Sequence, residues 1–99
     1  MRPACALLLI AISAGAAFAD DRQACLNAAE PIDAIAACTR LIASAAQEPM
    51  HAGDAYYNRG LAFMELEEWD HARSDFESSL EFRPDSQVAG EKVVWMGDR

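Results

Sequence analysis

The hydrophobic positions of this chain recur every three or four residues, and no stretch alternates apolar and polar residues as a strand does. Ile32, Ile35, Cys38, Leu41 and Ile42 show this helical spacing most clearly. The pattern predicts helices at about residues 21–29, 31–43, 54–66, 70–83 and 86–96. The sequence therefore predicts an all-α fold of about five helices.

Cap and turn residues mark the ends of these helices. Pro31 suits the first turn of the second helix, and Asp33 places negative charge near its amino end. Asp70 is the expected N-cap of the fourth helix. Pro84 ends that helix because proline cannot donate the next helical hydrogen bond. Ser86 is the expected cap of the last helix, which runs to about Met96.

Two segments line up when the chain is shifted by 38 residues. Cys25 then falls on Phe63, and Cys38 falls on Phe76. The other matched pairs are Pro31 with Trp69, Ala34 with Ala72, and Ile42 with Leu80. We therefore predict two copies of an antiparallel helix-turn-helix unit, of which the first is short at its amino end.

The same alignment predicts a disulfide. Phe63 and Phe76 are expected to face each other across one hairpin, so Cys25 and Cys38 should meet across the other. Closing this 14-residue loop would contribute about 3 kcal/mol in the chain-entropy model. Two buried free thiols are the alternative, since free cysteine is often buried.

The first 19 residues have the layout of a signal peptide. Arg2 is positively charged, Pro3–Ala19 carries no charge, and small residues precede a cut before Asp20. We predict that residues 1–19 are cleaved and that the protein is exported, to the periplasm or beyond. A membrane anchor and a lipoprotein are the alternatives, but a bilayer span needs about 20 apolar residues. Cys5 also stands too early for lipid attachment.

The charge narrows the choice of partners. The chain has 8 Lys and Arg against 16 Asp and Glu, a net charge of −8, and loss of Arg2 would make it −9. An acidic chain repels phosphate backbones, so we expect no nucleic-acid partner. Cleavage would leave two cysteines, an even number that fits one disulfide in an exported protein.

The second unit closely resembles a tetratricopeptide repeat. That family pairs a large aromatic residue with a glycine four later, then places further aromatic, small and proline residues at fixed steps. The matching residues here are Tyr56, Gly60, Phe63, Ala72, Phe76, Ser79 and Pro84. Arg59 stands where the family usually has leucine, and Ser79 where it usually has alanine. The resemblance covers residues 53–86 closely and 20–46 loosely, and the chain is similar to small exported bacterial proteins of this family.

The resemblance implies a fragment of an α-solenoid. We expect a signal peptide at 1–19, a partial first hairpin at 20–46, a connector at 47–53, the repeat at 54–86, and a C-terminal capping helix with a tail at 87–99. No membrane span is expected after cleavage. The disulfide and the last helix would close the two open ends of the stack.

The family also implies a function, a non-catalytic scaffold that binds a protein or peptide without a cofactor. Its groove would be lined by a stripe of the third helix, namely Tyr57, Asn58, Leu61, Met64 and Glu65. Asn58 matches a position that often hydrogen-bonds the backbone of a bound chain. In the alternative interpretation of the stripe, Leu61 and Met64 pack against Leu41 and Ile42 of the first unit.

Other functions fit the pattern less well. One is a structural component that assembles with itself or with an envelope complex through Val93, Trp95 and Met96, which would make it a homo-oligomer. Catalytic motifs are absent from the sequence, so we expect no enzyme. His51 and His71 do not combine with the cysteines in a zinc-binding spacing. The acidic turn, Glu65, Glu67, Glu68 and Asp70, either attracts a basic partner or is a solvated loop.

Overall fold

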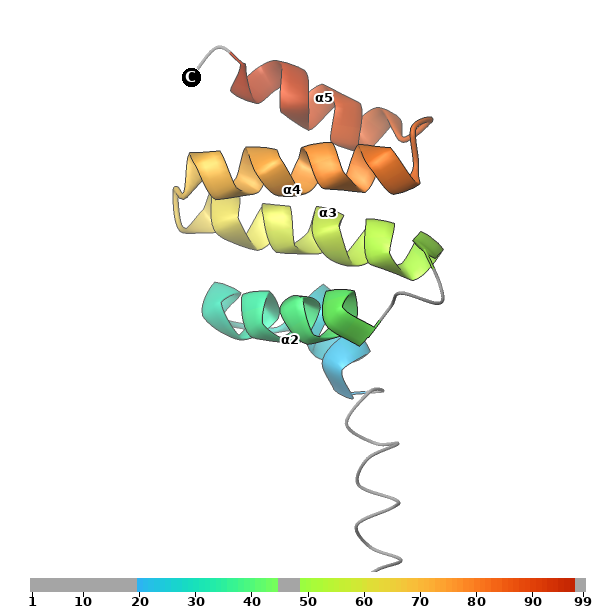
Figure 1. The fold of residues 1–99 in the computed structure, drawn as a ribbon. Helices are drawn as coiled ribbons and strands as arrows, with labels where there is room; N and C mark the ends of the chain where they lie inside the picture. Colours follow the sequence, from blue (N-terminus) through green and yellow to red (C-terminus); the bar gives the residue numbers. More distant parts are fainter. Residues whose placement is uncertain (1–19, 45–48, 98–99) are drawn as a thin grey trace, which may run out of the picture.

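The computed structural model describes residues 20–44 and 49–97, and it folds them into helices joined by short turns (Figure 1). Residues 20–27 form the first helical segment. It is followed by α2 (Pro31–Ser44), α3 (Pro49–Glu65), α4 (Trp69–Phe82) and α5 (Gln87–Met96). Within these residues the fold is all-α with five helical segments, which confirms the predicted fold class. The predicted signal peptide lies outside the described residues.

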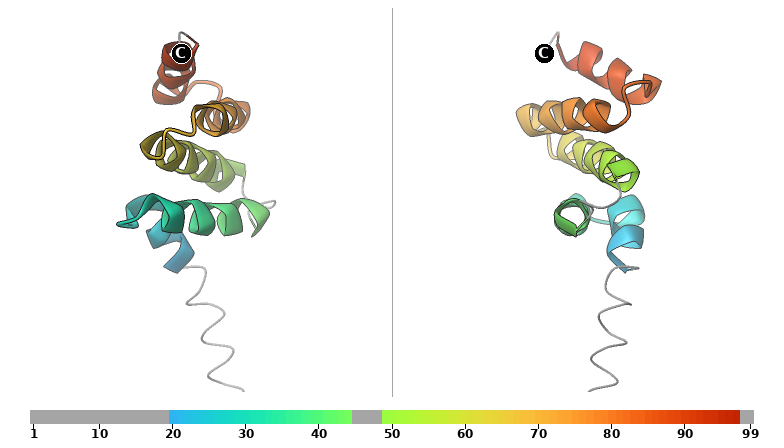
Figure 2. Two further views of the ribbon diagram at one scale, coloured as in Figure 1. Left: turned by 90° about the vertical axis from the view of Figure 1, so that its left-hand side faces the viewer. Right: turned by 45° about the vertical axis from the view of Figure 1, so that its right-hand side comes forward.

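The helices from α2 to α5 stack in the order of the chain, and each runs antiparallel to the next (Figure 1). Residues 20–27 lie beside α2 at the lower end of this stack, and α5 forms the upper end (Figure 2). Among the helices that the structure describes, each inner helix therefore packs between two neighbours, whereas α5 has a neighbour on only one side. This layered arrangement is the helical stack that the repeated hairpin pattern predicts.

Two predicted helix starts are wrong. The third helix begins at Pro49 rather than near Asp54, so residues 49–53 of the predicted connector are helical. Proline is well tolerated in a first helical turn, and Ala52 and Gly53 are buried, so packing favours the longer helix. The fourth helix begins at Trp69 with Glu68 as its N-cap, which places Asp70 in the first turn. The predicted cap of α5 is confirmed, because Ser86 accepts a hydrogen bond from the Ala89 backbone N–H.

The turn between α3 and α4 has a specific backbone geometry. Glu67 has a φ of 59°, in the left-handed region that side chains other than glycine rarely adopt. The Glu68 N–H bonds the Phe63 carbonyl at 2.9 Å, and the Glu67 N–H bonds the Met64 carbonyl at 2.9 Å. This bonding pattern closes the carboxyl end of α3 as a Schellman motif. The acidic turn is thus a tight reversal that starts α4 antiparallel to α3.

The buried side chains form two clusters. The first joins Cys25, Ala37, Cys38 and Ala55, so it binds the amino-terminal unit to α3. The second joins Ala72 and Phe76 of α4 to Met96 of α5, and it also receives side chains of α3, namely Tyr57, Leu61, Phe63 and Met64. Because α3 contributes to both clusters, it is the central helix of the stack. Any site on α3 is therefore held from both sides.

Candidate functional site

The three apolar residues of the predicted groove stripe face the second cluster. The Tyr57 ring packs against the Phe76 ring at a centroid distance of 5.5 Å. Leu61 and Met64 pack against the cluster of Ala72, Phe76 and Met96. The packing interpretation of Leu61 and Met64 had named Leu41 and Ile42 as their neighbours, but those two residues pack in the first cluster. Met96 of α5, only 3% exposed, is a buried member of that second cluster.

The two polar residues of the stripe are placed differently. Glu65 is the last residue of α3, and it is exposed. Asn58 is half-buried, and no hydrogen bond joins its amide to another residue of the described chain. Asn58, Leu61 and Glu65 follow one another at helical steps of three and four, so they share a face of α3. A partner lying along this face would meet an amide, an aliphatic side chain and a carboxylate.

A second face of α3 packs against α4 through small and aromatic residues. A Cβ atom at Gly60 would lie 2.7 Å from Cε1 of Phe76, so only glycine allows this close approach. On either side of Gly60, Tyr56 stacks on Phe82 at 5.9 Å and Phe63 stacks on His71 at 5.0 Å. Ala72 and Phe76 are fully buried. Five of the residues that carried the family resemblance therefore lie in this contact, namely Tyr56, Gly60, Phe63, Ala72 and Phe76.

Comparison with known protein families agrees with this packing. The model of the tetratricopeptide repeat matches residues 53–86. The chain contains a tetratricopeptide repeat. No curated protein and no solved structure matches the chain. The match covers the same residues, 53–86, that the resemblance covers closely.

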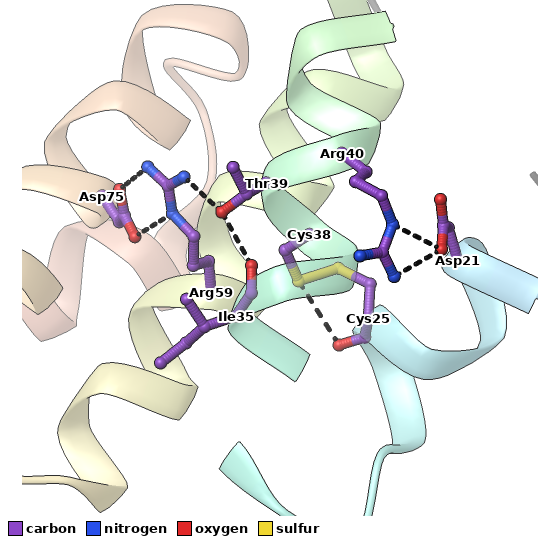
Figure 3. Close-up of a disulfide and its surroundings, with 8 residues drawn as sticks. All are labelled: Asp21, Cys25, Ile35, Cys38, Thr39, Arg40, Arg59 and Asp75. Atoms are coloured by element: carbon purple, nitrogen blue, oxygen red, sulfur yellow. Dashed lines mark hydrogen bonds and ion pairs between the residues drawn. A yellow bond between two sulfur atoms is a disulfide. The ribbon is translucent and has the colours of Figure 1, made fainter. Parts of the chain in front are cut away.

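Arg59 is the main departure from the pattern of the tetratricopeptide repeat, and the structure gives it a partner (Figure 3). Its Nε donates to Asp75 Oδ2 at 2.8 Å and its Nη2 donates to Asp75 Oδ1 at 2.7 Å. The Arg59 side chain is 20% exposed and that of Asp75 only 5%. This two-pronged ion pair satisfies a buried carboxylate, which would otherwise be costly inside the repeat.

The same guanidinium group connects three helices. Its Nη1 donates to Thr39 Oγ1 of α2 at 3.0 Å, and Thr39 in turn donates to the Ile35 carbonyl at 2.7 Å (Figure 3). The Arg59 carbon Cζ also lies 5.4 Å from the Tyr56 ring centroid and 5.9 Å from that of Phe63. The hydrogen bonds to Asp75 raise the pKa of Arg59 above its ordinary value. Arg59 therefore keeps its charge and holds α2, α3 and α4 together.

Our sequence interpretation missed this ion pair, although one signal was present. Asp75 lies on the inward stripe of α4, three residues after Ala72 and four before Ser79, where an apolar residue is expected. A carboxylate on a core-facing stripe needs a cation, and Arg59 is the cation that replaces leucine in the repeat. The spacing along the chain does not pair them, because they lie on different helices.

Ser79, the second departure from the family pattern, is also satisfied. It is 2% exposed, and its hydroxyl donates to the Gly53 carbonyl at 2.9 Å. Gly53 lies near the start of α3, and a Cβ there would lie 3.1 Å from Cβ of Phe82. The serine therefore adds a hydrogen bond between the two helices of the repeat at a point of close approach.

The first unit is held by sulfur rather than by aromatic rings. Cys25 and Cys38 form a disulfide between residues 20–27 and α2, and both are buried (Figure 3). Beside it, Arg40 donates to Asp21 Oδ1 through Nε at 2.9 Å and through Nη2 at 2.8 Å. The hydrogen bond to Asp21 raises the pKa of Arg40. These links attach the short first helix to α2 and cover the lower end of the stack.

The remaining titratable groups offer little chemistry. His71 lies in the first turn of α4, 3.0 Å from Glu68, and stacks on Phe63, so its ring packs against the turn between α3 and α4. Residues 20–44 and 49–97 contain no group of three metal-ligating side chains. In the same residues, no helix is long and apolar enough to cross a membrane. The face of α3 around Asn58 is therefore the candidate site that the geometry supports best.

Proposed function

We propose that the protein is a non-catalytic scaffold that binds a segment of a partner protein along the exposed face of α3. The observation that carries this proposal is the Asn58 amide, which is half-buried and hydrogen-bonded to no other residue of the described chain. An amide offers two donors and an acceptor, which suits the backbone of an extended peptide. Tetratricopeptide repeats generally mediate protein–protein interaction, which agrees with this use.

The neighbours of Asn58 suggest the chemistry of the partner. Glu65 provides an exposed carboxylate two turns further along the same face, and the chain has a net charge of −8. Both features favour a segment that carries Lys or Arg. Leu61 between them is half-buried and offers apolar contact. We therefore propose a basic, extended segment with one apolar residue as the ligand class.

The test is a selection of peptides from a random displayed library on the purified protein. Peptides enriched on the native protein are then measured against Asn58→Ala and against Ser74→Ala, a matched control at an exposed position of α4. We expect Asn58→Ala to weaken the affinity for these peptides by about three- to tenfold, because it removes one or two hydrogen bonds. Ser74→Ala should leave the affinity unchanged.

Two further variants sharpen the result. Tyr57→Phe keeps the ring contact with Phe76 and removes only the hydroxyl, so it tests binding without disturbing the repeat. Glu65→Gln should lower the affinity for Lys- and Arg-containing peptides and reduce its dependence on salt. The proposal is wrong if no peptide is enriched, or if Asn58→Ala and Ser74→Ala bind the selected peptides equally well.

We also propose that the protein acts outside the cytoplasm. The charge and apolar layout of residues 1–19 supports export, and a Cys25–Cys38 disulfide is most stable in an oxidising compartment. Mass spectrometry of the protein from its native host tests both points. We expect an amino terminus at Asp20 and a mass two hydrogens below that of the reduced chain. An intact Met1 or free thiols at Cys25 and Cys38 would contradict the proposal.

A further inference from the structure

One turn of α3 carries both the contacts with the first unit and the candidate binding residue. Ala55, which is 2% exposed, packs in the same cluster as the disulfide. Arg59 donates to the hydroxyl of Thr39 of α2 at 3.0 Å. Asn58 lies three residues after Ala55, so the two side chains are neighbours on the helix surface, and it directly precedes Arg59. The first unit therefore contacts α3 at the same turn that holds Asn58.

The disulfide and the hydrogen bond to α3 lie next to each other on α2 (Figure 3). Cys38 and Thr39 are consecutive residues, so the helix position that the disulfide fixes also fixes the hydroxyl that accepts from Arg59. Arg59 has two further bonds to Asp75 of α4, and these do not involve the first unit. A displacement of α2 would therefore remove the support of α3 on one side and leave the other side in place.

We propose that the Cys25–Cys38 disulfide is a redox switch for partner binding, an inference that rests on the proposed function of the Asn58 face. In the oxidised protein, Thr39 holds Arg59 and thereby keeps the neighbouring Asn58 in its binding position. In the reduced protein, α2 is no longer tied to the first helical segment and moves more freely against α3. The affinity for the partner then falls, because the binding arrangement is only partly populated.

The oxidation that sets the switch is a thiol–disulfide exchange. The two cysteines lose two protons and two electrons as the bond between their Sγ atoms forms, and an external disulfide takes these up and becomes a dithiol. Cytoplasmic thiols stay reduced, whereas cysteine pairs of exported proteins are oxidised. The chain would therefore acquire its full affinity for the partner only after export.

Without the sulfur bond the first helical segment is weakly held. It has eight residues, 20–27, and helices of this length are marginal on their own. Its ion pair to α2 joins Asp21 to Arg40, whose side chain is 59% exposed, so water screens much of the attraction. Because Cys25 and Cys38 are buried in the closed form, opening of this segment also gives the external disulfide access to the thiols.

The closed form suits both redox states of Cys38. Its Sγ lies 3.6 Å from the carbonyl oxygen of Cys25 (Figure 3). In the reduced protein this sulfur carries a hydrogen and can donate to that carbonyl, so the two thiols can approach before the bond forms. The reduced first unit can therefore close reversibly, and oxidation fixes the closed arrangement.

Thermodynamic linkage gives the switch a test that a disulfide without influence on the site would not pass. If the oxidised protein binds a peptide more tightly than the reduced protein does, the peptide must stabilise the disulfide by the same factor. A tenfold difference in affinity corresponds to a fall of about 30 mV in the reduction potential of this two-electron couple.

The probe is a cysteine-free peptide selected on the oxidised protein, and the full chain carries Cys5→Ala so that Cys25 and Cys38 are the only thiols. We expect the reduced protein to bind this peptide about three- to tenfold more weakly. Saturating peptide should lower the reduction potential of the cysteine pair by about 15–30 mV in dithiol redox buffers. Amide exchange of the reduced protein should rise in residues 20–44 and change little in α4.

Two variants test the contact through Thr39 with the disulfide intact. Thr39→Val keeps the shape of the side chain and removes the hydroxyl that accepts from Arg59. It should weaken the affinity of the oxidised protein by about two- to fivefold. Thr39→Ser keeps a hydroxyl and should bind as the native protein does. The matched control is Ser44→Ala, which removes an exposed hydroxyl of α2 that bonds the Leu41 carbonyl of its own helix.

The switch is overturned if oxidised and reduced protein bind the peptide equally well, or if the peptide leaves the reduction potential unchanged. It is also overturned if Thr39→Val binds as the native protein does, or if amide exchange rises in α4 as much as in residues 20–44. In all of these cases the oxidised native protein still binds the peptide, so the proposed function stands. Failure to enrich any peptide would instead overturn the proposed function, and the switch with it.

Discussion

The ring of Phe76 lies directly against the backbone of Gly60, where a methyl group would stand 2.7 Å from Cε1. Phe76 is fully buried, so its ring is enclosed by protein. The contact sets how closely α3 and α4 approach each other, and it therefore positions the α3 face that carries Asn58. Stability of the repeat and geometry of the candidate site depend on the same pair of residues.

Substitution of Gly60 and of Gly90 by alanine should have opposite effects. Both glycines are helical, so alanine alone would stabilise each by up to about 1 kcal/mol. Gly60→Ala also overpacks Phe76, at a cost of about 1–3 kcal/mol, so we expect a net loss of stability. Gly90→Ala meets no atom within 4 Å and should raise stability. Urea denaturation at low protein concentration measures both; a gain for Gly60→Ala would contradict the close contact.

Removal of one partner of the Arg59–Asp75 pair should be more damaging than removal of both. Arg59→Leu leaves the carboxylate of Asp75, whose side chain is 5% exposed, without its cation, and we expect a loss of about 3 kcal/mol. The double variant Arg59→Leu/Asp75→Leu leaves no unpaired charge and should recover most of that loss. A double-mutant cycle in urea measures the coupling, with exposed Arg73→Leu as control. If the stability losses of the two single variants add up to the loss of the double variant, the ion pair contributes no coupling energy to folding.

Reduction of the disulfide should loosen the first unit selectively. Opening the loop between Cys25 and Cys38 should cost about 3 kcal/mol of unfolding free energy. Because the bond lies at the lower end of the stack, amide exchange should accelerate in residues 20–44 before it changes in α4. Reductant should have no effect on Cys25→Ser/Cys38→Ser, the control. Equal acceleration in α4 would mean that the stack unfolds as one cooperative unit.

Glu67→Gly should stabilise the protein. The residue has a φ of 59°, which glycine adopts without the steric cost paid by a side chain, so we expect a gain of about 1 kcal/mol. Glu77→Gly, at an exposed position inside α4, is the matched control and should lose about 1 kcal/mol. Thermal unfolding followed by circular dichroism measures both variants. If both lose stability, the turn does not hold Glu67 in the left-handed conformation.

Helix positions and the sulfur pair could be predicted because their signals are local or repeated. The three-to-four-residue spacing, the Ser86 cap and Pro84 are local signals, because each acts on nearby backbone. The cysteine pair followed from the internal repeat, because the alignment of one half of the chain with the other matched the cysteines to Phe63 and Phe76. The start of α3 could not be predicted in this way. Pro49 can stand at the start of a helix or just after its end. The burial of Ala52 and Gly53 against the rest of the fold favours the longer helix that begins at Pro49.

The sequence by itself determined that the chain forms antiparallel helical hairpins, which residues carry the family pattern, and which two cysteines face each other. Only the tertiary structure decided that Asp75 pairs with Arg59 and that Leu61 and Met64 pack against the second cluster. It also decided that Val94 rather than Val93 or Met96 faces outward. The reason is physical. Spacing along a helix assigns a residue to a face, but the offset and angle between packed helices decide which distant residue meets that face.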